Sequence, residues 1–138
     1  MTGTDHSMEG AIKAALLAAL AALPVNRMGD GEAENAPVPH GWLGEMIGTD
    51  WGAKGREGRE IRTGISIADR GEDARLATLM RQAEAALRAV PRTLGAWDHS
   101  GVTISRVRMV RRRDGLRVGM IDLRIRIWPV ADNFGQEN

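Results

Sequence analysis

Residues 59–68 alternate one by one between two kinds of side chain, and no other stretch of the sequence restricts the fold as strongly. Four of them, Ile61, Thr63, Ile65 and Ile67, fall on one side of an extended chain, because successive side chains of a strand point to opposite faces. Polar side chains and glycine fill the positions between them. This period of two predicts a strand over Arg59–Ala68 that buries one face and keeps the other in water.

The segment after this strand has the period of a helix. Its apolar residues recur every three or four positions and share one face, as in a helix packed on a core. They are Leu76, Leu79, Met80, Ala83, Leu87 and Val90. Asp73 is the candidate N-cap and Pro91 stops the run, so we predict a helix between these two residues.

Two further strands are expected over Val102–Val110 and Leu116–Trp128. Arg113-Asp114-Gly115 lies between them. An Asp-Gly pair between two such runs indicates a hairpin, because glycine accepts the positive φ that a tight turn needs. Residues 59–128 are therefore predicted to form a strand, a helix and a two-stranded hairpin, in that order.

The apolar side chains change phase within both strands of the hairpin. Such a change is absorbed by a bulge, which adds one residue to one strand of a pair. We expect one bulge near Ser105-Arg106 and a second near Met120-Ile121. With these bulges Arg124 and Arg126 lie on the exposed face of the sheet.

The sequence begins with an alanine- and leucine-rich segment that predicts a helix over Met8–Leu23. Ser7 is a plausible N-cap, Glu9 suits the positive end of the helix dipole, and Pro24 closes the helix. Its apolar run is ten residues long. A membrane span needs about 20, and a signal peptide would carry more positive charge before the run, so we expect neither.

A brief strand around Val25–Met28 and a strand over Trp42–Ile47 complete the order α-β-β-α-β-β. The predicted fold class is α+β: a single domain over residues 1–138, with one antiparallel sheet of about four strands and both helices packed on one face. Residues 1–6 and 130–138 are expected to be flexible ends. The glycine-rich stretch 48–58 is expected to be a flexible loop.

Nothing in this sequence assembles a recognisable catalytic centre. There is no cysteine, which excludes disulfides, thiolate zinc sites and thiol catalysis. The glycine loop around Lys54 is not a phosphate-binding loop, because glycine follows the lysine and a strand follows the loop. The three histidines, His6, His40 and His99, are expected to be solvated surface residues.

Three acids, Asp30, Glu32 and Glu34, lack the ligand spacing of a calcium loop. We therefore expect no catalytic residue, no cofactor and no metal site, and a protein that is not an enzyme.

Charge is distributed very unevenly along the chain. Between Arg106 and Arg126 there are eight arginines and two acids, a local net charge of +6, while the whole chain has +1. The rest of the chain is therefore acidic. Such asymmetry suits nucleic acid, a solvated sheet face or the acidic side of a second copy, and all three readings stay open. Trp128 is the lone aromatic residue of the basic hairpin, which gives little support to base stacking.

Several segments, taken in order, resemble the tail-completion family of tailed phages and gene transfer agents, small tail terminators such as that of phage lambda. They are the opening helix from Met8, Pro37-Val38-Pro39 before Trp42-Leu43-Gly44-Glu45, Asp50-Trp51 before the glycine loop, Ile65-Ser66-Ile67-Ala68-Asp69 before a helix, and the closing Asp122-Leu123-Arg124-Ile125-Arg126-Ile127. The resemblance covers about residues 8–128. It departs from the family at His40 or Gly41, where members commonly carry an aromatic residue.

The resemblance implies a ring, usually a hexamer, that caps the tail tube and docks to the head connector or stopper protein. Its partners would be other copies of itself, the tail tube protein and the head–tail connector, with DNA passing through the channel and no membrane involved. The protein would lie at the head-proximal end of the virion tail after assembly in the host cytoplasm. A head-side connector adaptor and a nucleic-acid-binding module are the alternatives.

We expect the subunit or partner contacts among one tryptophan and the cationic side chains of the loop and the hairpin. These residues are Trp51, Lys54, Arg56, Arg59, Arg106, Arg108, Arg111, Arg112, Arg113, Arg124 and Arg126. A ring of identical subunits joins one patch to a different patch on the next copy, so a basic side and an acidic side on one subunit fit that architecture.

Overall fold

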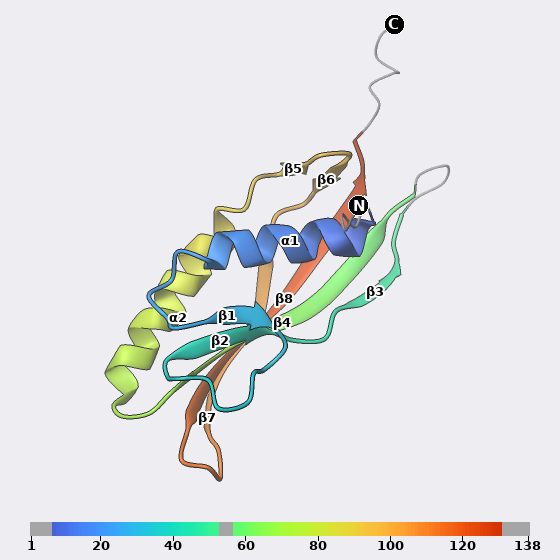
Figure 1. Cartoon of the computed structure of the whole chain (residues 1–138). Coiled ribbons are helices and arrows are strands. Elements are labelled where there is room, and N and C mark those ends of the chain that lie inside the picture. The colour runs from blue at the N-terminus through green and yellow to red at the C-terminus, as the bar shows by residue number, and fades with distance from the viewer. Residues whose placement is uncertain (1–6, 53–56, 131–138) are drawn as a thin grey trace, which may run out of the picture.

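The computed structural model describes residues 7–52 and 57–130. Two helices, α1 (Met8–Leu20) and α2 (Asp73–Arg88), cover one sheet (Figure 1). Its strands are β1 (Met28–Asp30), β2 (His40–Leu43), β3 (Ile47–Asp50), β4 (Arg59–Asp69), β5 (Thr93–Leu94), β6 (Trp97–His99), β7 (Thr103–Arg111) and β8 (Arg117–Pro129). The α+β class is confirmed.

The two long strands β4 and β8 form the centre of the sheet. They are antiparallel and stay in register from Arg59 opposite Ile127 to Asp69 opposite Arg117. Along the free side of β4, β3 pairs with its first part and β2 with its last part. Along the free side of β8, β7 pairs with its first part and β6 with its last part. β1 pairs with β2 in parallel.

The expected sheet of about four antiparallel strands is therefore wrong in number and in direction: the sheet has eight strands and is mixed. The single strand expected over Trp42–Ile47 is two strands. Between them the chain steps along β4, where the Thr63 hydroxyl donates to the carbonyl oxygens of Gly44 and Glu45 at 3.3 and 2.9 Å. The second strand, β3, occupies the start of the stretch expected to be a flexible loop.

Helix α1 begins as predicted and ends early. The Ser7 hydroxyl accepts a hydrogen bond from the Gly10 N–H at 2.9 Å, which satisfies one of the free donors of the first turn. The helix ends at Leu20, before the expected Leu23, because the Ala21 N–H bonds to the Ala18 carbonyl in a tighter turn. Leu23 still reaches the core.

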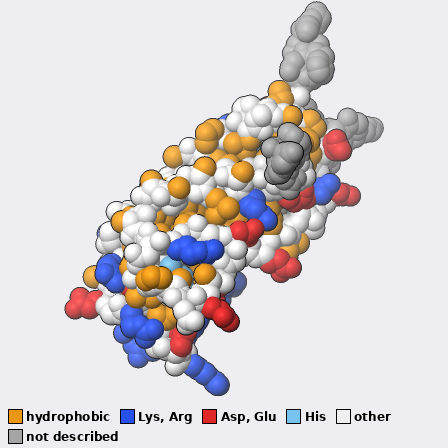
Figure 2. All heavy atoms as spheres, viewed as in Figure 1, with side chains coloured by type: hydrophobic (Ala, Val, Ile, Leu, Met, Phe, Trp, Pro, Cys, Tyr) orange, Lys and Arg blue, Asp and Glu red, His pale blue; other side chains and the backbone are white. Residues whose placement is uncertain are grey.

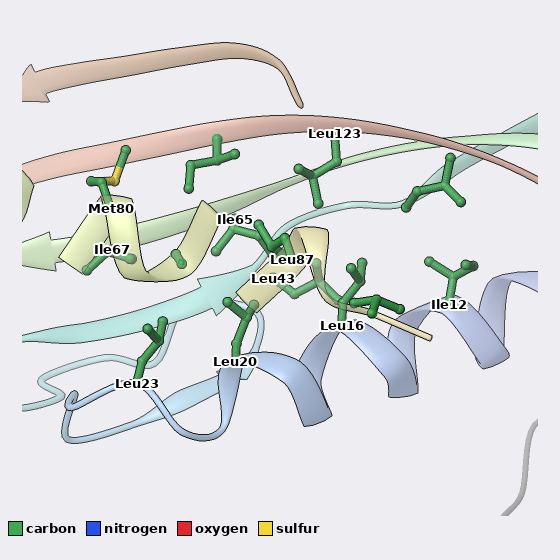
Figure 3. Close-up of a cluster of buried hydrophobic side chains, with 14 of the residues drawn as sticks. Ile12, Leu16, Leu20, Leu23, Leu43, Ile65, Ile67, Met80, Leu87 and Leu123 are labelled. Carbon is green, nitrogen blue, oxygen red and sulfur yellow. The ribbon is translucent and has the colours of Figure 1, made fainter. Parts of the chain in front are cut away.

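Both helices pack on the same face of the sheet, as predicted. Figure 3 shows side chains from α1, α2 and the central strands meeting in one cluster. Its fully buried members include Ile12, Leu16, Leu20, Leu43, Ile61, Ile65, Ile67, Leu76, Leu87, Ile121, Leu123 and Ile125. The alternation across β4 is thus confirmed, with residues 61, 63, 65 and 67 buried.

The bulge expected near Ser105-Arg106 is present as a register shift between Ile104 and Arg106. The bulge expected near Met120-Ile121 is absent, because β8 stays in unbroken register with β4. The phase change has another cause, a second small core on the far face of the sheet. There Val118, Ala68 and Leu116 are buried, with Val38, Trp42 and Met120 packed against them.

Gly119 lies on the helix face of β8 and gives α2 room to approach. A Cβ atom built on Gly119 would meet the Met80 side chain, with Cε at 2.8 Å and Cγ at 3.1 Å. Met80 is 4% exposed, so its side chain is held in this position by the surrounding core. The glycine therefore permits close packing of helix on strand.

Helix α2 buries the predicted apolar face, but its cap residue differs and it ends at Arg88, so Val90 lies beyond its end. Glu72 occupies the N-cap position and Asp73 lies in the first turn, where it forms an ion pair with Arg117. Within the described part of the chain, neither helix is long and apolar enough to cross a membrane.

Two histidines are buried, contrary to expectation. His40 begins β2, is 3% exposed and stacks on Trp42 with the ring centres 5.6 Å apart. His99 in β6 is also 3% exposed. Its Nε2 donates to the Pro91 carbonyl at 2.6 Å and its Nδ1 accepts from the Gly101 N–H at 2.9 Å, so the neutral ring satisfies both bonds. Burial lowers the pKa of His99.

Candidate functional site

The face of the sheet that points away from the helices carries a cluster of arginines around one carboxylate. Arg126 Nε donates to Glu60 at 3.1 Å, Arg62 donates to its other oxygen at 3.1 Å, and Arg124 lies 3.9 Å away. The hydrogen bond from Arg126 is the main reason why the pKa of Glu60 is lowered. Arg124 and Arg126 do share the exposed face, as predicted, but part of their charge is balanced within the subunit.

Three more of the expected contact residues also bind acids of their own chain. Arg106 bonds to Asp122 at 2.9 Å across the β7–β8 pair, and Arg59 bonds to Glu9 of α1 at 2.6 Å. Arg112 lies between two carboxylates, Glu32 at 2.8 Å and Asp114 at 2.7 Å. Part of the charge of these side chains is therefore balanced within the subunit.

Asp30, Glu32 and Glu34 were considered above as metal ligands. Asp30 instead binds Lys13 at 3.0 Å, and Glu32 is the partner of Arg112. In the described residues no three acids or histidines come together as metal ligands would.

A second group of arginines has no acid partner among the described residues. Arg108, Arg111 and Arg113 lie on β7 and in its turn, and all three are exposed. Figure 2 shows Lys and Arg side chains gathered at the end of the molecule where this hairpin lies. Lys54 and Arg56, also expected at contacts, lie outside the described residues.

Trp51 lies on the same face as the arginine cluster, beside Arg126. Its ring is 5.8 Å from that of Trp128, and the guanidinium carbon of Arg126 is 5.3 Å from the ring centre. Gly58 makes this possible, because a Cβ there would meet Trp51 Cε3 at 3.0 Å. Trp128 is therefore not the only aromatic residue beside the basic hairpin. The pairing could not be read from the sequence, since it depends on how the chain folds back after Trp51.

Among the described residues four large apolar side chains are exposed, and all lie on the outer strands β3 and β7. Ile47 is 52% exposed, Val107 45%, Met109 44% and Val110 37%. On β7 they interleave with Arg106, Arg108 and Arg111. The sequence places Ile47, Val107, Met109 and Val110 in strands but does not identify them as surface features.

Two of the shallow hollows on the described surface lie against the sheet, and neither contains a recognisable catalytic arrangement. The larger, about 650 Å³, lies beside Arg70, Arg112 and the loop before His40. The other, about 470 Å³, crosses the arginine face between Ile47 and Arg106. The Thr93 hydroxyl donates to the Asp98 carboxylate at 2.6 Å, but this exposed pair joins β5 to β6 and lines neither hollow.

The distinguishing features of this small α+β protein are thus its unpaired surface arginines, its exposed apolar side chains and its open outer strands. Such features are typical of a subunit of a larger assembly. The chain belongs to the family of the tail completion protein gp17, whose model matches residues 10–128. It is therefore a tail completion protein, a structural component of a phage-type virion.

Solved structures share its fold, among them one from a virion and one from a bacteriophage. A chain from the virion of a native gene transfer agent particle superposes with a TM-score of 0.75 at 20% identity, over 90% of this chain and 99% of that chain. The gp17 protein of bacteriophage SPP1 superposes with a TM-score of 0.55 at 14% identity, over 96% of this chain and 99% of that one. Comparison with curated proteins gave no match.

Proposed function

We propose that the protein is a tail terminator: a ring, with six copies as the expected number, that caps the finished tail tube and joins it to the head connector. The observation that carries this proposal is the family match over residues 10–128 of a chain whose fold offers open strands on two sides. An isolated sheet with exposed edges tends to associate, and a closed ring covers each edge with the next copy.

The distribution of charge supports a ring with unlike contact surfaces. Arg108, Arg111 and Arg113 lack acid partners in the described part of the chain, while Glu45 and Asp50 at β3 lack basic ones. A subunit with one basic and one acidic side fits a head-to-tail contact between copies.

A channel for DNA favours few free cations on its wall, because every phosphate contact adds affinity and slows passage. The arginines of the sheet face meet this condition in part, since Glu60 and Asp122 balance Arg126 and Arg106. The unbalanced arginines of the hairpin are therefore assigned to contacts between subunits.

The proposal is tested by mixing the purified protein with tubes of its tail tube protein. We expect native mass spectrometry to give a closed ring, or a monomer that closes into a ring on tube ends. Electron microscopy should show that ring at one end of each tube. A stable monomer that leaves tubes bare contradicts the proposal, and a ring found only on the head-side connector identifies an adaptor instead.

A second candidate function is nucleic-acid binding, which the Trp51–Trp128 pair beside Arg126 favours. Stacking aromatics next to arginines are the usual means of holding single strands. Titration with a single-stranded oligonucleotide at two salt concentrations separates the two functions. Tight, salt-sensitive binding that Trp51→Ala abolishes would establish it; binding unaffected by that change would exclude this site.

A further inference from the structure

Two strands of the sheet keep one edge open, and they lie on opposite sides of it. β7 pairs only with β8, and β3 pairs only with β4. The remaining outer strands are much less suited to pairing, since β1 has three residues and β5 has two. In the described chain, β3 and β7 are thus the two open edges long enough to pair with a strand of another chain.

The β7 edge carries exposed apolar side chains, as a strand that contacts another chain does. Ser105–Arg111 is exposed at every position, on both faces of the strand. Soluble proteins blunt an exposed edge with charge or by covering it, yet here Val107, Met109 and Val110 remain 37–45% exposed. The helices leave β7 uncovered although Val107 and Met109 lie in register with core residues Ile121 and Gly119.

The β3 edge complements it. All four residues from Ile47 to Asp50 are exposed, and Ile47 is the most exposed large apolar side chain described. Glu45 and Asp50 give this side a negative charge without an ion-pair partner in the described part of the chain. Figure 2 shows acidic side chains along the side of the molecule where β3 lies.

Strand direction makes the two edges compatible in copies that share one orientation. β3, β4, β8 and β7 are successively antiparallel, so β7 and β3 run in opposite directions. A second copy turned about an axis near the strand direction therefore presents its β3 antiparallel to β7 of the first. This contact leaves the outer edges open for the next copies, so it repeats and closes only as a ring.

The two edges are staggered along the sheet, which adds a geometric condition. β3 lies beside Arg59–Arg62 of β4, whereas Arg106–Arg111 lies at the level of Gly64–Asp69. Pairing them shifts each copy along its neighbour. Closed sheets absorb such a shift by tilting their strands against the axis.

We infer that neighbouring copies of the chain join by antiparallel pairing of β7 of one with β3 of the next, which makes the ring a continuous sheet. This inference rests on the proposed ring and names the contact that builds it. The register that places Val110 opposite Ile47 keeps the two helix faces on the same side, because Val110 and Ile47 both lie on the face away from the helices. It also places Met109 opposite Gly48 on the helix face.

The absence of cysteine allows a direct test by cross-linking. Directly opposed residues of an antiparallel pair have Cα atoms about 4.5–5.5 Å apart, which suits a disulfide. We expect the double variant Ile47→Cys with Val110→Cys to give, on mild oxidation, a ladder of covalent multimers that ends at the ring. A mixture of the two single variants should give dimers only, because each contact uses one cysteine from each kind of edge.

The matched control is Ile47→Cys with Met109→Cys, which places the cysteines on opposite faces and should cross-link at least about tenfold less. Native mass spectrometry of the same unoxidised samples reports ring formation separately. Rings without the Val110 cross-link, or with equal cross-linking of both pairs, overturn the inference and leave the ring intact. Absence of rings and of tube capping overturns the proposed function, and the inference with it.

Charge reversal gives a second, independent readout. Arg108→Glu with Arg111→Glu should lower the ring fraction about tenfold, since the β7 edge would then carry negative charge where it meets the acidic β3 side. Adding Glu45→Arg and Asp50→Arg should restore it. Arg81→Glu, which reverses one arginine on the exposed surface of α2, is the control and should have no effect on the ring. Full assembly of the Arg108/Arg111 variant, or failure of the restoring changes, contradicts the contact.

Discussion

Gly119→Ala is expected to destabilise the subunit, although alanine is the smallest possible addition and the φ angle of Gly119 is not in the left-handed region. The new Cβ would overlap the Met80 side chain, with Cγ only 3.1 Å away, and Met80 cannot swing into solvent because it is 4% exposed. Overpacking of this kind costs about 1–3 kcal/mol of the free energy of unfolding. The measurement is urea unfolding followed by circular dichroism.

A double-mutant cycle separates overlap from other causes. Met80→Ala alone removes buried side-chain atoms and should cost about 2–5 kcal/mol. In that background Gly119→Ala should cost almost nothing, or stabilise the strand slightly, giving a coupling energy of about 1–3 kcal/mol. Gly64→Ala on β4 is the control, because its Cβ would have ordinary contacts of 3.4 and 3.6 Å on the other face. Additive effects of the two substitutions would refute the reasoning. So would evidence of a bulge at Met120-Ile121, because the structure has β8 in unbroken register with β4 there.

Three further expectations concern the subunit itself. Ile65→Asp should abolish folding, since Ile65 is fully buried and its replacement leaves a carboxylate in the core without a partner; a native circular-dichroism spectrum would contradict this. The folded-state pKa of His99 lies below its ordinary 6.5, because burial and nearby Arg92 outweigh Asp98 and the Pro91 carbonyl. The unfolded chain therefore binds a proton first, so the free energy of unfolding should fall as the pH drops below about 6.5 and level off once folded His99 is protonated, and His99→Gln should remove this slope. Asp69→Asn should lower stability at neutral pH by about 1–3 kcal/mol, because buried Asp69 accepts from Arg75 and from the Arg70 N–H, and chemical denaturation of both proteins at pH 7 checks it.

The parts of the fold that the sequence predicts correctly are those with a clear local period. β4, α2 and the β7–β8 hairpin follow from alternation, from the helical stripe and from the Asp-Gly turn. The division of Trp42–Ile47 into two strands has no local signal, because both pieces obtain their hydrogen bonds from β4. Pairing with a distant strand decides such cases, and a four-residue strand has too little pattern of its own.

The phase change in β8 was interpreted wrongly for a related reason. Apolar residues on both faces of one strand indicate either a bulge or two cores, and the sequence cannot distinguish them. The second core depends on Trp42 and Leu116, which reach Val118 only in the folded chain. Strands buried on both faces lose the simple alternation.

The sequence predicts the basic hairpin of the candidate site. It does not predict which of the arginines are paired with acids of the same chain. Glu60 and Arg126 are 66 positions apart in the sequence, and their hydrogen bond exists because β4 and β8 pair in that register. The same register separates arginines with internal partners from Arg108, Arg111 and Arg113, which have none among the described residues. The structure thus moves the strongest candidates for partner contacts from the sheet face to the β7 edge.

The central claim, that unlike edges of this subunit close into a ring at the end of a tail tube, is tested most directly by cryo-electron microscopy of tubes capped by the protein. The account predicts a single closed ring at one end, with the β7 density of each copy continuous with β3 of the next. A cap whose subunits meet through their helices, or tubes that end without this protein, would contradict it.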